Sequence, residues 1–139
     1  MYLPKLCTYR HKNNFFYGVY KENSMADLSQ LAPWVNLKQA IEEGGLNELI
    51  KISDQAPVTH TEFDFERPIL NPEKIICVGV NFPDRNAEYK DGKKNSSYMS
   101  LFPRFERGFT GHMKPLIRPK ESLQLDYEGE LAVIIGKSG

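Results

Sequence analysis

The sequence lacks the features that mark several large classes of protein. It has only two cysteines, Cys7 and Cys77, and no Cys-x-x-Cys or Cys/His cluster of the kind that binds structural zinc. Two such isolated thiols indicate free cysteines in a reducing compartment rather than a disulfide framework. An excess of charge is also absent, because 18 basic residues balance 18 acidic ones. We therefore expect no nucleic-acid partner, since such partners need a basic excess.

Long apolar runs are missing as well. No stretch approaches the ~20 apolar residues that cross a bilayer, and the opening MYLPKLCTYRHKNN lacks the apolar core of a signal peptide. These absences predict no membrane partner and a cytoplasmic protein. What is present is an ordinary globular composition, 40% hydrophobic and 26% charged. The length of 139 residues suits one domain, or a small domain and part of a larger one.

The first seventy residues predict a small α+β module. Asn13-Asn14 marks a turn between two short strands, and Asn36 is a candidate helix N-cap. Gly44-Gly45 separates two short helices. The expected elements are strands at 5–10 and 15–20, a helical turn at 27–31, and helices at 37–43 and from residue 46 to 50.

The remainder predicts further strands joined by irregular connections. The run KIICVGV, residues 74–80, reads as a buried strand, and the polar stretch 81–97 reads as a loop. DYEGELAVIIGK, residues 126–137, reads as a strong strand that needs cover on both faces. We therefore expect more protein after Gly139, or a second chain that supplies this cover. Other expected strands are at 61–65, 99–105 and 116–119.

Two carboxylates, Glu128 and Glu130, stand at the start of that last strand. Alternate residues of a strand share one face, so the two side chains would lie side by side, with about 6.5–7 Å between their Cα atoms. Gly129 leaves the opposite face bare for a closely passing backbone. A divalent cation relieves the repulsion of two such carboxylates, and oxygen ligands favour Mg²⁺, Mn²⁺ or Ca²⁺.

Two other interpretations of the pair compete with metal binding. A Glu-x-Glu on a strand is commonly a solvated polar face, and short motifs are weak signals. A glycosidase acid and base is a poorer interpretation, because those carboxylates lie on either side of a substrate.

The segment from Lys74 to Lys137 resembles the fumarylacetoacetate hydrolase family. The match runs in order through KIICVGVNF and PDRNAEY, then LFPR, then the prolines 115 and 119 with Ser122, and finally LDYEGELAVIIGK. It covers about half of the chain, and the first seventy residues resemble the family's variable amino-terminal domain only loosely. The resemblance implies an accessory domain at residues 1–70, and the start of a mixed β-roll catalytic domain at 71–139.

The resemblance also implies a function. Glu128 and Glu130 would bind Mg²⁺ or Mn²⁺, with Ca²⁺ as a further option, and Asp126 would orient the site. The substrates would be small 2-oxo or 1,3-dioxo acids, which such enzymes hydrolyse at a C–C bond, hydrate, isomerise or decarboxylate. The protein would be a homodimer. The alternative is a truncated or non-catalytic module with this fold, which serves binding or assembly.

Two departures from the family pattern bear on the reaction. Hydrolytic members carry a His-x-x-Glu dyad, whereas this chain has Arg85 and Glu88 at those places. Arginine stays protonated, so Arg85 would clamp a carboxylate rather than act as a base. The family's third metal ligand, an aspartate, comes after the residues present here. Both Arg85 and Glu88 are candidate catalytic residues.

Four other polar residues are weaker candidates. Arg104 stands where the family has a lysine near the substrate, so it either neutralises a carboxylate or is an ordinary surface arginine. His112 could replace the missing histidine base, or it could be a loop residue without a role. His11 and His60 have no matching carboxylates, and we expect both to be structural or solvent-facing.

Overall fold

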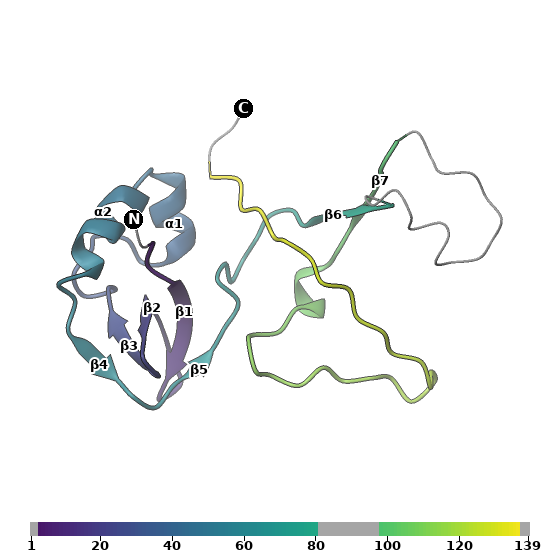
Figure 1. Ribbon diagram of the computed structural model, residues 1–139, viewed down its shortest axis with the longest axis horizontal. Helices are drawn as coiled ribbons and strands as arrows, with labels where there is room; N and C mark the ends of the chain where they lie inside the picture. Colours follow the sequence, from purple (N-terminus) through teal and green to yellow (C-terminus); the bar gives the residue numbers. More distant parts are fainter. Residues whose placement is uncertain (1–2, 81–97, 137–139) are drawn as a thin grey trace. The chain divides into compact units, whose positions relative to one another are not determined.

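The computed structural model describes residues 3–80 and 98–136 and divides the chain into two compact units (Figure 1). One unit combines residues 1–70 with 110–139, and the other contains residues 71–109. Both helices and strands are present, as expected for an α+β chain. The division into family domains at 1–70 and 71–139 stays a prediction, because compactness does not define a sequence domain.

The first unit is built on a five-stranded antiparallel sheet with the order β4-β3-β2-β1-β5. The loops β1–β2 and β2–β3 each have two residues with positive φ, Lys12-Asn13 and Glu22-Asn23. Such loops match the twist of a hairpin, and asparagine tolerates that conformation. The strands are β1 (Leu6–His11), β2 (Asn14–Lys21), β3 (Ser24–Asp27), β4 (Val58–His60) and β5 (Asp64–Phe65).

Two sequence predictions for this sheet need correction. The helical turn expected at 27–31 forms one residue later, where the backbone N–H groups of Leu31 and Ala32 donate to the carbonyl of Leu28 at 3.0 and 3.1 Å, and β3 ends at Asp27. The expected strand at 61–65 is two shorter strands, β4 and β5, which pair at opposite edges of the sheet. Residues 61–63 therefore cross from one edge to the other. The expected hairpin of the first two strands is confirmed.

Helices α1 (Leu37–Glu42) and α2 (Leu46–Ser53) form where the sequence predicts them. The side chain of Asn36 accepts a hydrogen bond from the backbone N–H of Gln39 at 2.9 Å, which caps α1. The helices pack on one face of the sheet around a single apolar cluster. Its buried members are Tyr17, Val19, Ala26, Leu28, Trp34, Leu37, Ala40, Leu49 and Ala56.

The opposite face of the sheet, which we call the aromatic face, carries a different set of side chains. Tyr9 pairs with Phe16 and Phe65 across neighbouring strands, and Met25 pairs with His60. Tyr9 is fully buried although no helix covers it. Phe63, from the crossing segment, meets the Tyr9 ring edge-on at 6.1 Å and supplies part of that cover.

The second unit contains a two-stranded antiparallel sheet, β6 (Ile76–Gly79) with β7 (Ser100–Pro103), and a short 3₁₀ helix η1 (Glu106–Gly108). The strands expected near 74–80 and 99–105 are confirmed. The expectation that the first is buried is wrong, because Ile76 remains 62% exposed. Two strands alone do not present enough surface to cover both faces.

The strands expected at 116–119 and 126–137 are not formed within the described residues, which end at 136. A strand exists only through hydrogen bonds to a neighbouring strand, and none pairs with this segment in the described part of the chain. Its apolar side chains are exposed, with Leu131 at 96%. Within the described ranges, no helix is long and apolar enough to cross a membrane.

Candidate functional site

The carboxylate pair lies in the extended segment that follows Gln124. Glu128 and Glu130 are both exposed, and a Cβ placed on Gly129 would meet nothing within 4 Å. The close backbone expected beside Gly129 is therefore absent among the described residues. Carboxylate oxygens suit a hard divalent ion. Among residues 3–80 and 98–136, however, no three His, Cys, Asp or Glu side chains are grouped to hold one. The pair fits the donor chemistry of an Mg²⁺ or Mn²⁺ site without completing a ligand set.

Arg104 lies directly after β7 in the other compact unit. Its backbone N–H donates to the carbonyl of Ile75 at 3.0 Å, which extends the β6–β7 ladder by one bond. Its guanidinium lies 5.2 Å from the centre of the Phe102 ring, in a cation–π contact. The side chain is exposed, so its charge is accessible to an anion. The other two candidates, Arg85 and Glu88, lie outside the described residues.

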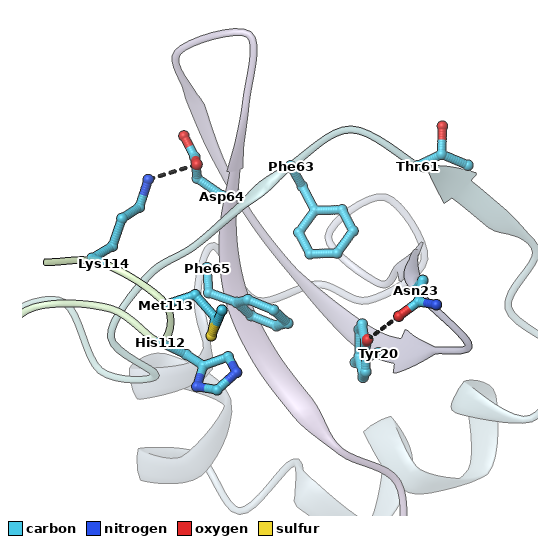
Figure 2. Close-up of a pocket in the computed structure, with 9 residues that line it drawn as sticks. All are labelled: Tyr20, Asn23, Thr61, Phe63, Asp64, Phe65, His112, Met113 and Lys114. Atoms are coloured by element: carbon cyan, nitrogen blue, oxygen red, sulfur yellow. Dashed lines mark hydrogen bonds and ion pairs between the residues drawn. The ribbon is translucent and has the colours of Figure 1, made fainter.

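A cavity of about 330 Å³ opens on the aromatic face of the first unit. Three segments of the chain form it: the end of β2 with its turn, the crossing segment with β5, and the stretch after Gly111 (Figure 2). The lining residues are Tyr20, Asn23, Thr61, Phe63, Asp64, Phe65, His112, Met113 and Lys114.

Ring contacts form the wall of this cavity. Phe63 and Phe65 meet edge-to-face with centroids 5.2 Å apart, and the Tyr20 ring lies 5.4 Å from Phe65. The His112 ring also meets Phe65 in an edge-to-face arrangement, with ring centroids 5.1 Å apart. Such tilted arrangements are favourable for aromatic rings. The Tyr20 hydroxyl donates to Asn23 Oδ1 at 2.7 Å, which closes one end of the wall.

The carboxylate of Asp64 forms ion pairs with two basic side chains beside the cavity. Lys114 Nζ lies 2.6 Å from Asp64 Oδ1, and an Arg10 guanidinium nitrogen lies 3.0 Å from Asp64 Oδ2. The hydrogen bond from Lys114 is the main cause that lowers the pKa of Asp64, and Arg10 adds to it. Asp64 therefore stays ionised and links β1 to residue 114.

A glycine brings the 110–114 stretch close to the sheet. A Cβ on Gly111 would lie 2.2 Å from the carbonyl oxygen of Phe65, so only glycine allows this approach. This cavity was not predicted from the sequence, although the alternation Phe63-Asp64-Phe65 and the isolated Gly111 are visible signals. For His112, the sequence left two interpretations, a replacement for the missing base or a loop residue without a role. The structure gives it an edge contact with Phe65, and its use as a base stays a prediction.

Two sequence comparisons with known proteins relate residues of this chain to one family. Residues 74–139 match the family model described as fumarylacetoacetate (FAA) hydrolase C-terminal. Oxaloacetate tautomerase fahd2, mitochondrial, from Xenopus laevis is 36% identical over 87 residues, which cover 63% of this chain and 27% of that protein. Oxaloacetate tautomerase YisK from Bacillus subtilis is 39% identical over 82 residues, covering 57% of this chain and 27% of that protein.

The fold comparison agrees with the sequence comparisons. A solved fumarylacetoacetate hydrolase from Exiguobacterium antarcticum superposes with a TM-score of 0.57 at 20% identity, over 77% of this chain and 37% of that one. Residues 74–139 match the fumarylacetoacetate hydrolase family, as the sequence motifs predict. It spans about a quarter of the length of the curated relatives that it matches.

Proposed function

We propose that the chain is part of a divalent-metal-dependent enzyme of this family that acts on small 2-oxo or 1,3-dioxo acids. Within the reactions expected from the sequence, we favour isomerisation, namely keto–enol tautomerisation of an oxaloacetate-like acid. The observation that carries the proposal is the family match over 74–139, a segment that includes both candidate carboxylates. Similar proteins from a frog and a bacterium are both named oxaloacetate tautomerase, which supports the choice of reaction.

Each candidate residue has a role in that reaction. Glu128 and Glu130 would hold Mg²⁺ or Mn²⁺, or Ca²⁺ less favourably, and such an ion stabilises the enolate of a chelated 2-oxo acid. Arg104 would bind a substrate carboxylate, because its guanidinium is exposed and held beside the Phe102 ring.

Arg85 and Glu88 would supply the second carboxylate contact and the proton transfer. Arg85 stays protonated and would bind the second carboxylate, whereas Glu88 would move a proton between the carbon next to the carbonyl and the enol oxygen. Tautomerisation moves that proton without activating water. The arginine in place of a hydrolytic histidine therefore supports tautomerisation over C–C hydrolysis.

Metal binding tests the proposal first. Calorimetric titration of the 139-residue chain with Mn²⁺ should show binding that the double variant E128Q/E130Q loses. The matched control is Glu121→Gln, because Glu121 is an exposed glutamate shortly before the pair in the sequence. Equal binding by all three chains would contradict the assigned ligands.

Enzymatic turnover tests the reaction itself. The loss of the enol absorbance of oxaloacetate should be faster with the chain and Mn²⁺ than with Mn²⁺ alone, and Glu88→Gln should remove the difference. A rate that Glu88→Gln leaves unchanged would contradict the proton-transfer role.

A non-catalytic binding or assembly module is the second candidate. The observation that favours it is the exposure of the carboxylate segment, in which Leu131 to Ile135 stay outside any sheet among the described residues. Measured metal binding without turnover would support this candidate. A homodimer and a cytoplasmic location remain proposals of the same kind, and the frog relative is named mitochondrial.

A further inference from the structure

All three histidines of the chain lie on the aromatic face or against its edge. Two of them, His11 from β1 and His60 from β4, stack with ring centroids 4.2 Å apart and planes 27° apart. They are 49 residues apart in sequence, since 60 − 11 = 49. The stack therefore joins the end of the first strand to the beginning of the segment that crosses the sheet.

Hydrogen bonds fix both rings in this stack. His11 Nδ1 lies 2.6 Å from the carbonyl oxygen of Glu62, so this nitrogen carries the hydrogen and donates. His60 Nδ1 lies 2.9 Å from the hydroxyl of Tyr9, and the tautomer of His60 decides which of the two groups donates. The Tyr9 side chain is fully buried, so its hydroxyl depends on the protein for a partner. Each histidine thus holds the crossing segment to β1 by one bond.

We propose that His11 and His60 form a pH-sensitive clasp that fastens residues 58–65 across the aromatic face and loosens them when the stack takes up a proton. Two imidazolium rings face-to-face at 4.2 Å would repel each other. A proton on His60 Nδ1 would also make this nitrogen a donor, so that the buried Tyr9 hydroxyl would have to accept from it. Protonation therefore weakens the stack between β1 and β4.

The charged groups around His60 set the direction of the effect. Burial is the main cause that lowers the pKa of His60, the adjacent His11 adds to it, Asp27 opposes it, and Lys12 lowers the pKa further. The unfolded segment consequently binds a proton more readily than the folded one. The stabilisation is complete above the ordinary histidine pKa of 6.5 and is lost as the pH falls below it.

Loosening the clasp would also affect part of the segment that matches the family model. The crossing segment leads directly into Asp64 and Phe65, which hold Lys114 and His112. Release of residues 58–65 would therefore also free residues 110–114, which lie within the family match at 74–139. Acidification would therefore change the contacts of residues 110–114 through the two histidines, which are not part of the proposed metal site.

Hydrogen exchange measured on the whole chain tests the clasp. From about pH 7.5 to about pH 5.5, exchange corrected for its intrinsic pH dependence should accelerate ~10-fold in residues 58–65 and follow in 110–114. The β1–β2 hairpin loop and the helices should change much less. His60→Asn keeps an acceptor close to the Nδ1 position and His11→Asn keeps a donor there, so both variants should lose the acid response.

The control is His112→Asn, since His112 lies outside the stack, and it should keep the acid response in residues 58–65. A response that survives in both His11→Asn and His60→Asn would overturn the proposal, as would acceleration spread evenly over the chain. If either variant fails to fold, the ring proton shifts of the unaltered chain decide. If His11 and His60 titrate in two separate steps, with the lower pKa at His60, the result supports the clasp. If both titrate independently near the ordinary histidine pKa of 6.5, the result refutes it.

Discussion

Lys114 Nζ and Asp64 Oδ1 lie 2.6 Å apart and join residues 110–114 to the edge strand β5. Gly111 makes this possible, because a side chain there would collide with the Phe65 carbonyl. The family match begins at residue 74, so the ion pair connects family sequence to a sheet made wholly from residues before it. The amino-terminal sheet therefore holds a segment of the sequence that matches the family model.

Replacing Lys114 tests this connection. Lys114→Met should raise the pKa of Asp64 toward its ordinary value of 3.8, because the hydrogen bond that lowers it is lost. The pair's contribution in the unaltered chain is present above that value and disappears as the pH falls through the lowered pKa of the folded state. Carboxyl NMR titration measures the shift. Lys120→Met, an exposed change in the same segment, should leave Asp64 unchanged.

A hydrogen bond from Tyr17 is expected to stabilise the helix-covered face of the sheet. The buried Tyr17 hydroxyl donates to the carbonyl of Trp34 at 2.8 Å, so Tyr17→Phe should leave that carbonyl without its partner. We expect a loss of about 1–3 kcal/mol in the free energy of unfolding, measured with urea. Tyr127→Phe is the control, because Tyr127 is 89% exposed and should change stability little. Equal stabilities for the two variants would contradict the role of the bond.

Strands β2 and β3 approach closely at Gly18. A Cβ at this position would lie 2.2 Å from the backbone oxygen of Ala26, so Gly18→Ala should force the strands apart. The expected cost is about 1–3 kcal/mol, as for other overpacked sites. Gly129→Ala introduces the same methyl group into open space and should be nearly neutral. Thermal unfolding of the two variants checks the contrast.

Asn36 tests the start of α1. Asn36→Ala removes the acceptor for the Gln39 N–H, which should reduce stability by about 1 kcal/mol. Asn36→Asp keeps a capping oxygen and should restore most of the loss. Circular dichroism during urea unfolding measures both variants, and a loss that aspartate does not recover would mean that the cap is not the cause.

Local signals in the sequence predicted the parts of the fold that short-range chemistry determines. Asn36 predicted the helix start, and Asn13-Asn14 predicted the first hairpin. The third strand was missed because its four residues, Ser24–Asp27, are too few to show an alternating pattern, although the Glu22-Asn23 turn uses the same backbone conformation as the first turn. The strand expected at 126–137 was wrong for a long-range reason, since its formation depends on a neighbouring strand.

The candidate site also has parts that local sequence patterns predict and parts that they do not. The Glu-x-Glu motif and the ordered matches before it predicted the family, which the comparisons confirm. The cavity on the aromatic face was not predictable from spacing, because Tyr20, Phe63 and His112 meet only through the crossing segment and the close approach at Gly111. The catalytic roles of Arg85 and Glu88 remain predictions, as do the metal ligands.

The exposed run from Leu131 to Ile135 also bears on how the chain behaves in concentrated solution. It consists of apolar, mostly β-branched residues without charge or proline, and its side chains project into solvent. Such segments stack into intermolecular sheets when nothing pairs with them first. We therefore expect the solubility of this chain to be limited by aggregation through this run at temperatures where the amino-terminal sheet is still folded.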